Sequence, residues 1–340
     1  MTATSHPRAI GAWLLVSALL VLAMVVVGGA TRLTHSGLSI TEWQPIVGTI
    51  PPLSEADWQA AFAKYQQIPE YKVLNQGMTL AEFKPLFWWE WSHRLLGRLV
   101  GVVFLVPMLA FAWLGSIGRG LWPRLIGLFA LGGLQGAAGW YMVASGLVDR
   151  TDVSQYRLAL HLGLAVLILA AIVWTALDVL RGNANGQSRG RWGIALALVI
   201  LVYIQILLGA LVAGLDAGLT YNTWPLMDGR LVPPDAFSLQ PWWLSAFEDV
   251  PTVQFDHRMV AYAVVVLAVM NVLVVSPTRL TAWVLLVLVL AQVGLGIWTL
   301  LEVVPLHLAL SHQLLAMLVL LAAVVHLHTV RHSTPPSAMV

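Results

Sequence analysis

Eight long apolar stretches with almost no charged side chains constrain this chain more than any other feature. A helix needs about 20 apolar residues to cross a bilayer, and each stretch reaches or approaches that length. The 340 residues are 59% hydrophobic and only 10% charged, which is more apolar surface than a soluble core could hide. We therefore expect an all-α integral membrane protein with eight transmembrane helices. The expected spans are residues 9–31, 99–118, 125–148, 158–177, 192–215, 259–278, 280–301 and 303–330.

The connections on the two sides of the membrane differ in charge. Eight spans place both termini on one side, and the segments there carry eight arginines against one acid, Asp178. The other fifteen of the sixteen acids fall on the opposite side. Since cytoplasmic loops carry an excess of basic residues, we predict that both termini are cytoplasmic. The net charge of +2 hides this asymmetry and gives no reason to expect a nucleic-acid partner.

The N-terminus and the absence of cysteine limit the location and the chemistry. The first apolar run follows a single arginine, Arg8, and is too long for a signal-peptide core, so we interpret it as a retained span. It lacks the several arginines of an organelle-targeting peptide, which makes a bacterial inner membrane the expected location. Without cysteine the chain has no disulfides, thiolate ligands, iron–sulfur clusters or covalent haem attachment.

An internal duplication divides the chain into two halves of four spans. Residues 90–94 align with 254–258, 158–162 less closely with 309–313, 37–39 with 218–220, and 135–139 with 292–296. Because an even number of spans returns the chain to its starting side, the halves share one topology and should be related by an axis along the membrane normal. We predict two pseudo-symmetric four-helix bundles, 1–183 with a long outer loop at 32–92, and 184–340.

The long outer loop carries two signals for helix starts. Ser54 with Asp57 and Thr79 with Glu82 resemble capping boxes, and Trp58 begins an aromatic pattern at helical spacing. The loop could form a lid over the outer ends of the bundles together with the connection at 216–253. A plain tether between helices is about equally compatible with the sequence.

Four histidines stand near the outer ends of the second and fourth spans of each half: His93, His161, His257 and His312. A single histidine in a membrane helix is often only a packed, hydrogen-bonded residue. Their joint placement indicates more, since two neutral imidazoles on facing helices can ligate a haem iron from both sides. Bundle interiors are where such cofactors are held. We predict two haem sites near one membrane surface, each within one half.

Two arginines and several further histidines accompany the predicted ligands. Arg94 and Arg258 follow His93 and His257 and could neutralise haem propionates. His307 is a weaker alternative to His312. The remaining histidines are interpreted as bystanders, with His35 the least clear; these are His6, His35, His326, His328 and His332.

Glu90 distinguishes the two halves. It precedes His93 by three positions, which places both on one helix face, whereas the equivalent residue in the second half is Gln254. A carboxyl group can exchange protons and an amide cannot do so usefully. We therefore predict chemistry in the first half and electron handling in the second. In the alternative interpretation Glu90 only orients a ligand or pairs with Arg94.

These residues and the motifs around them resemble the haem A synthase family, in its cysteine-free proteobacterial and mitochondrial branch. The resemblance covers nearly the whole chain and is most specific from Gly28 to Gly101. It rests on the segments 28–39, 43–45, 69–72, 82–84 and 90–98, with Gly48, Pro51 and Pro52. Some members have a cysteine pair in the outer loop that this chain lacks, so no redox role of that pair is transferred.

The resemblance implies a function and assigns the site. It implies eight helices in two bundles, with substrate haem O bound by His93 and His161 and haem B bound by His257 and His312. It also implies that the haem O methyl group is oxidised to the formyl group of haem A for cytochrome oxidase, with Glu90 as the catalytic acid. The expected route passes through a hydroxymethyl intermediate with water as the oxygen source, because a bis-histidine iron has no open position for dioxygen.

Two other classes of protein remain as alternatives. A di-haem cytochrome that moves electrons across the membrane would place one haem near each face, whereas the four predicted ligands share the outer, periplasmic side. A transporter with a proton relay would need ionisable residues near the bilayer midplane, where the spans have almost none. The expected partners of a haem A synthase are membrane lipid, haem O, haem O synthase, oxidase assembly factors and further copies of the chain.

Overall fold

The computed structural model describes residues 4–44, 46–148, 151–181, 192–275 and 280–332. Within them the chain is all helical, and eight helices are long and apolar enough to cross a membrane. The prediction of a multi-pass all-α membrane protein is therefore confirmed. The eight are α1 (Pro7–Leu33), α4 (Leu80–Trp113), α5 (Trp122–Gly146), α6 (Gln155–Arg181), α7 (Trp192–Gly214), α9 (Val250–Met270, continued by the π-helical η4, Asn271–Val275), α10 (Leu280–Leu301) and α11 (Leu306–Arg331).

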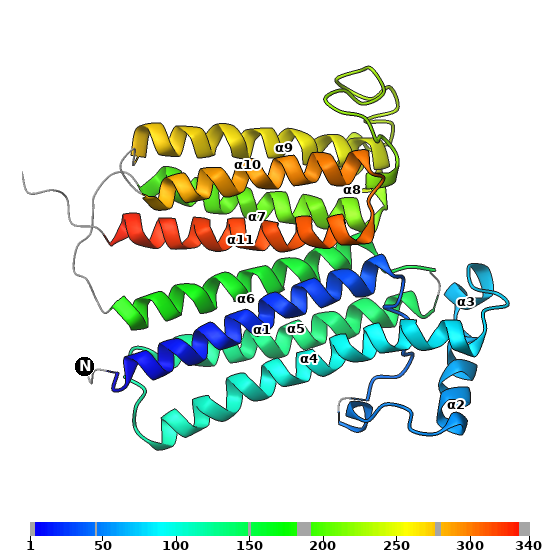
Figure 1. Ribbon diagram of the computed structural model, residues 1–340, viewed down its shortest axis with the longest axis horizontal. Coiled ribbons are helices and arrows are strands. Elements are labelled where there is room, and N and C mark those ends of the chain that lie inside the picture. Colours follow the sequence, from blue (N-terminus) through cyan, green and yellow to red (C-terminus); the bar gives the residue numbers. More distant parts are fainter. Residues whose placement is uncertain (1–3, 45, 149–150, 182–191, 276–279, 333–340) are drawn as a thin grey trace, which may run out of the picture.

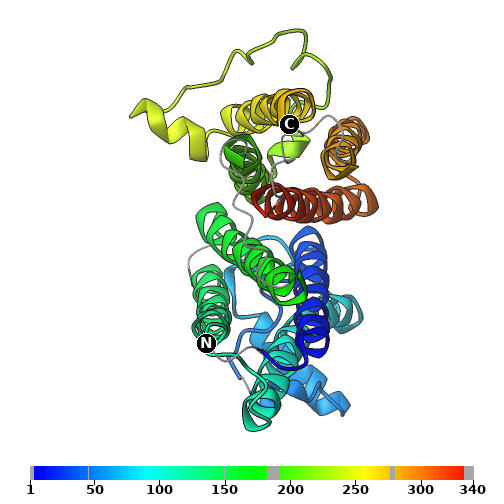
Figure 2. The ribbon, with the colours of Figure 1, turned by 90° about the vertical axis from the view of Figure 1, so that its left-hand side faces the viewer.

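The long helices form two groups of four (Figures 1 and 2). Helices α1, α4, α5 and α6 make one group, and α7, α9, α10 and α11 make the other. The start of α1 and the end of α11 lie at the same end of the molecule, as an even number of spans requires. This arrangement is consistent with two fused bundles. The predicted boundary at 183/184 lies outside the described residues.

Helix α6 joins the two groups. It contacts α1 and α5 of its own group and also α7 and α11 of the other. At Gly163 a side chain would lie 2.7 Å from Cδ2 of Leu207 and 3.0 Å from the Tyr203 hydroxyl, so glycine is what lets α7 approach this closely. Small residues serve the same purpose at helix interfaces in membranes generally, where van der Waals packing replaces the hydrophobic driving force.

Polar contacts also link the groups at several levels. Gln313 of α11 donates from Nε2 to the backbone carbonyl of Val25 in α1, at 2.8 Å. At the end of the molecule that carries α2 and α3, Arg32 donates to both carboxylate oxygens of Asp216 at 3.2 Å and to the carbonyl of Ala213 at 2.9 Å. These contacts fix the position of the two groups relative to each other along the helix axes.

The long outer loop folds into a small structured cap on the first group. Ser54 and Thr79 form the two predicted capping boxes, which begin α2 (Glu55–Tyr65) and α4; α3 is Pro69–Val73. The expected loop at 32–92 is therefore too long, because α4 begins at Leu80 and runs unbroken into the membrane segment. The cap has its own apolar cluster: Leu38, Trp58, Phe62, Tyr65, Ile68, Phe83, Phe87 and Val153.

The corresponding connection in the second half is less regular. It contains η2 (Ala217–Leu219), η3 (Trp242–Leu244) and α8 (Ser245–Glu248), and it lies at the same end of the molecule as α2 and α3 (Figure 1). Helix α2 packs on α4, whereas α8 packs on α9. Both connections are folded against the helices, and neither is a plain tether.

Candidate functional site

The structure brings the four predicted histidines together in two pairs, one in each half. His93 of α4 and His161 of α6 lie near enough to influence each other electrostatically, as do His257 of α9 and His312 of α11. Each pair thus comes from the second and fourth long helix of its group, which is the pairing expected from the repeat.

Each of the four imidazoles packs against a glycine of the preceding long helix. The ring occupies the space that a side chain at the glycine would need, so no other residue could stand there without moving the histidine. The distances from an ideal Cβ to the nearest ring atom are 3.0 Å for Gly28 and His93 Nε2, 2.9 Å for Gly139 and His161 Cε1, 3.2 Å for Gly209 and His257 Cε1, and 2.7 Å for Gly296 and His312 Cε1.

Three of the four histidines also contact a glutamine that lies one helical turn before the glycine. In each case the glutamine Nε2 donates to the backbone carbonyl of the histidine and lies beside its ring. Gln135 is 3.1 Å from His161 Nδ1, Gln205 is 3.1 Å from His257 Nδ1, and Gln292 is 3.3 Å from His312 Nε2. The fourth histidine, His93, has Met24 at this position.

The internal repeat predicted only part of this pattern. Residues 135–139 align with 292–296 without an assigned role, whereas Gln205 with Gly209 and Met24 with Gly28 were not predicted. The signal was nevertheless present: a glycine four residues after a glutamine or methionine occurs in the first and third long helix of each half.

Unpaired buried atoms indicate that the two histidine pairs are built to hold a further group. The side-chain oxygens of Gln135, Gln205 and Gln292 are buried without a hydrogen-bond partner among the described residues, as is Nδ1 of His312. Because buried polar atoms are normally paired, these unpaired atoms beside the imidazoles indicate a place where a bound group would complete the hydrogen bonding. The donor set of two imidazoles per site fits a bis-histidine haem.

Glu90 lies at the outer edge of the first pair and is 2% exposed. One carboxylate oxygen accepts from the Ser39 hydroxyl at 2.8 Å and from the Ile40 backbone N–H at 2.6 Å. The other accepts from the guanidinium of Arg94, one turn along α4. The carboxylate is therefore fully paired, as a buried charge must be. The pairing with Arg94 is the contact that the alternative interpretation expected.

The second half has the same arrangement around the equivalent residue, with an amide in place of the acid. Gln254 is 3% exposed and donates from Nε2 to the carbonyl of Tyr221 at 3.1 Å, while its own side-chain oxygen has no partner among the described residues. Arg258 donates to the carbonyls of Tyr221 at 2.7 Å and Thr223 at 3.0 Å. The two arrangements hold matching segments of backbone, residues 40–42 and 221–223. Of the two, the first has a buried carboxylate at this position and the second does not.

The two arginines predicted to neutralise propionates are engaged with the protein. Arg94 donates to the carbonyls of Ile40 at 2.6 Å and Glu42 at 2.7 Å in addition to Glu90. Arg258 has the equivalent carbonyl contacts, with its Nε buried and without a partner among the described residues. Both arginines thus tie the outer loop to the helix that bears the first histidine of each pair, and their role toward propionates stays a prediction.

The cap, outside the membrane segments, contains a buried carboxyl group. Glu70 of α3 is 4% exposed and accepts a hydrogen bond from the Tyr65 hydroxyl at 3.0 Å. Burial raises the pKa of Glu70 to about 7, because the surrounding aromatic cluster disfavours the charged carboxylate. The cap should therefore respond to pH near neutrality.

Two of the bystander histidines join a charged cluster at the opposite end of the helices. His328 donates to Asp178 at 2.8 Å, and His332 lies 3.8 Å from the same carboxylate. Arg124 pairs with Asp178 at 2.5 Å, and Arg181 donates to Nδ1 of His328 at 3.1 Å. Although the three ligand-type side chains lie within 4.8 Å of one another, Arg124 already neutralises the one carboxylate and Arg181 occupies Nδ1 of His328. The cluster ties α5, α6 and α11 together.

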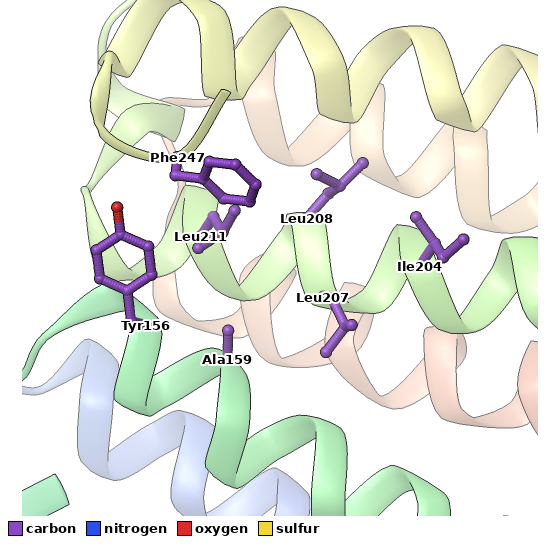
Figure 3. Close-up of a pocket in the computed structure, with 7 residues that line it drawn as sticks. All are labelled: Tyr156, Ala159, Ile204, Leu207, Leu208, Leu211 and Phe247. Atoms are coloured by element: carbon purple, nitrogen blue, oxygen red, sulfur yellow. The ribbon is translucent and has the colours of Figure 1, made fainter. Parts of the chain in front are cut away.

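A small cavity of about 260 Å³ opens between α6 and α7, where the two groups meet (Figure 3). Leu207, Leu208 and Leu211 of α7 form its floor, and Tyr156 and Phe247 stand at one end. The Tyr156 hydroxyl donates to Glu248 at 2.7 Å. The cavity lining contains none of the four paired histidines, and its walls are apolar.

Comparison with known proteins gives a consistent result. Residues 11–324 match the model of a family described as cytochrome oxidase assembly protein (COX15-CtaA). The chain is 52% identical over 326 residues to a protein of Parvibaculum lavamentivorans and 54% identical over 330 residues to one of Azorhizobium caulinodans, and each match covers 95% of both chains. A Nitrosospira multiformis protein is 51% identical over 334 residues, covering 95% of this chain and 94% of its own. All three are named "Heme A synthase".

Proposed function

Since the chain belongs to the COX15-CtaA family of cytochrome oxidase assembly proteins, we propose that it is a haem A synthase, a membrane oxidoreductase that converts haem O to haem A. The observation that supports this most directly is the pair of matched histidine sites, of which only one stands beside a buried carboxylate. Two equivalent sites with unequal surroundings suit an enzyme that transforms one porphyrin and keeps another.

The first half, 1–183, is proposed as the substrate half. His93 and His161 would ligate the iron of haem O from opposite sides, and Gly28 and Gly139 give these two rings the room they occupy. The second half, 184–340, would hold haem B between His257 and His312, and haem B supplies one-electron transfer when bound.

The oxidation needs water, an electron acceptor and a place for protons. Conversion of the methyl to a hydroxymethyl group takes one water and releases two protons and two electrons, and a second two-electron oxidation gives the formyl group. Water is the proposed oxygen source, because two axial histidines leave the iron no position for dioxygen. The electrons would leave by way of the second half.

Glu90 is proposed as the group that manages the protons. It is buried, charged and one turn from His93, and its counterpart Gln254 cannot exchange protons usefully. Arg94, Ser39 and the Ile40 N–H hold the carboxylate in one orientation. The same contacts support a second role, in which Glu90 fastens the outer segment 39–42 over the substrate.

The proposed setting is a bacterial inner membrane with both termini cytoplasmic and both histidine pairs toward the periplasm. The arginine-rich connections and the clustering of acids at the other side of the spans support this orientation. Haem O synthase and oxidase assembly factors are the proposed protein partners, and the chain is proposed to act as a homo-oligomer.

Glu90→Gln is the test of the catalytic role. The variant copies the second half, where Gln254 still holds the backbone of the outer connection through Tyr221. It should therefore still bind haem but accumulate haem O. Ser39→Ala is the matched control, because it removes one hydrogen bond to Glu90 and keeps the carboxylate. In cells supplied with haem O, haem A formation should fall strongly in Glu90→Gln and less in Ser39→Ala.

Two results would contradict the proposal. A normal rate of haem A formation in Glu90→Gln would remove Glu90 from the chemistry. An absorption spectrum of the purified protein with haem B at both sites and no haem O or haem A would instead favour the di-haem cytochrome.

A further inference from the structure

The four histidine sites follow one pattern, and His93 departs from it. At three sites a glutamine lies one turn before the glycine that supports the ring, and an alanine lies one turn after the histidine. These alanines are Ala165, Ala261 and Ala316. At His93 the glutamine is replaced by Met24 and the alanine by Gly97.

The two replacements fit each other in space. The Cε of Met24 lies 3.2 Å from where a Cβ of Gly97 would be, so the methionine side chain reaches over this glycine. An alanine at 97 would press on Met24, which explains why the smaller residue stands there. The departure at His93 thus consists of two residues that contact each other, Met24 on α1 and Gly97 on α4.

The replacement changes what holds the imidazole. At the other three sites the amide lies within 3.1 to 3.3 Å of a ring nitrogen and donates to the backbone carbonyl of the same histidine. A methionine thioether donates no hydrogen bond and accepts only weakly. The amide lies nearest Nδ1 in His161 and His257 and beside Nε2 in His312, so what the three sites share is an amide that holds both the ring and the backbone of the histidine. Neighbouring groups that orient a ligating histidine are typically worth about 10–100-fold in metal affinity when they are lost.

We propose that Met24 is a positioning residue that makes His93 the weakly held axial ligand, so that the first site exchanges its porphyrin while the second site retains its own. The inference rests on the proposed function, since it explains how one of two equivalent sites can serve a substrate. A substrate site must release its product, and His93 alone lacks the amide that holds His161, His257 and His312 in place.

The test measures porphyrin release without turnover. Purified full-length protein carrying its bound haems is mixed with an excess of an apo-globin that captures free haem, and the transfer is followed by absorption. The unaltered protein should release haem in two phases, fast from the first site and slow from the second.

Met24→Gln should slow the fast phase by about tenfold or more, by giving His93 the amide that the other sites have. Met24→Leu is the matched control, because leucine is apolar and of similar size, and its fast phase should stay close to that of the unaltered protein. The reciprocal change, Gln205→Met, should accelerate the slow phase by about tenfold or more.

The outcomes separate this inference from the proposed function. Equal release from Met24→Gln and Met24→Leu, or an unchanged slow phase in Gln205→Met, would overturn the role of Met24 even if the enzyme makes haem A. A merely structural role would shift the melting temperature of the variants alike and leave the two release phases unchanged. If Met24→Gln fails to fold, Gln205→Met still decides the question. Failure of the unaltered protein to bind haem O would instead contradict the proposed function.

Discussion

The contact between Gly29 and Gln313 gives the sharpest prediction about how the two bundles are joined. A Cβ at Gly29 would lie 1.8 Å from Oε1, 2.7 Å from Cδ and 2.9 Å from Nε2 of Gln313. All three distances are below any real contact, so an alanine there must displace the whole amide. The displaced amide would lose its 2.8 Å hydrogen bond to the Val25 carbonyl.

The cost follows from these two losses. The hydrogen bond contributes about 1 kcal/mol, and forcing extra volume into a packed interface costs about 1–3 kcal/mol. Gly29→Ala should therefore destabilise the protein by about 2–4 kcal/mol. Gln313→Ala removes the obstructing side chain together with its hydrogen bond. In that background Gly29→Ala should cost little, which gives a coupling energy of about 2–4 kcal/mol.

The assay is a double-mutant cycle on the full-length protein in mild detergent, unfolded by a denaturing detergent and followed by tryptophan fluorescence. Gly101→Ala on α4 is the matched control, because a Cβ there meets nothing within 4 Å. It should leave stability unchanged or raise it by up to about 1 kcal/mol. Additivity of the two single changes within about 0.5 kcal/mol would refute the reasoning, since independent sites behave in that way.

Two further predictions concern the cap and the second histidine pair. The folded pKa of Glu70, about 7, lies above its ordinary value of 4.5, so the folded cap binds more protons across that window. The free energy of unfolding should fall by at most about 3 kcal/mol as pH rises from 4.5 to 7 and then level off. In thermal melts, Glu70→Gln should abolish this dependence of stability on pH. An unaltered protein whose stability does not change over this pH range would contradict the prediction. Gly296→Ala should displace the His312 ring, whose Cε1 lies 2.7 Å from the added atom, and halve the haem content measured by pyridine haemochrome. Gly294→Ala, two residues away with nothing within 4 Å, should keep it, and equal content in both variants would count against the site.

Much of the fold was predictable from the sequence because its signals are local. Stretches of about 20 apolar residues predict membrane helices whatever their neighbours are, and the two capping boxes predicted the starts of α2 and α4. The outer loop is shorter than its apolar pattern indicates. The apolar run begins at residue 99, but α4 already begins after Thr79, and its polar first part carries Glu90 and His93.

The candidate site was predictable only in its strongest residues. The histidines and Glu90 stood out because ionisable groups are rare in these spans and because the repeat placed them at matching points. Gly209 and Gln205 did not stand out, since glycine and glutamine are unremarkable in a membrane helix until a ring is seen against them. Their role depends on which face of α1 or α7 meets the neighbouring helix.

The sequence by itself determined that this chain has eight spans long and apolar enough to cross a membrane, because that property depends on the length and composition of each stretch. The tertiary structure decided which side chains meet. It showed that Arg94 and Arg258 hold loop carbonyls, that Gln313 docks on Gly29, and that His93 has Met24 where the other histidines have an amide. These facts depend on helix rotation and spacing of a few ångströms, which hydrophobic pattern alone does not encode.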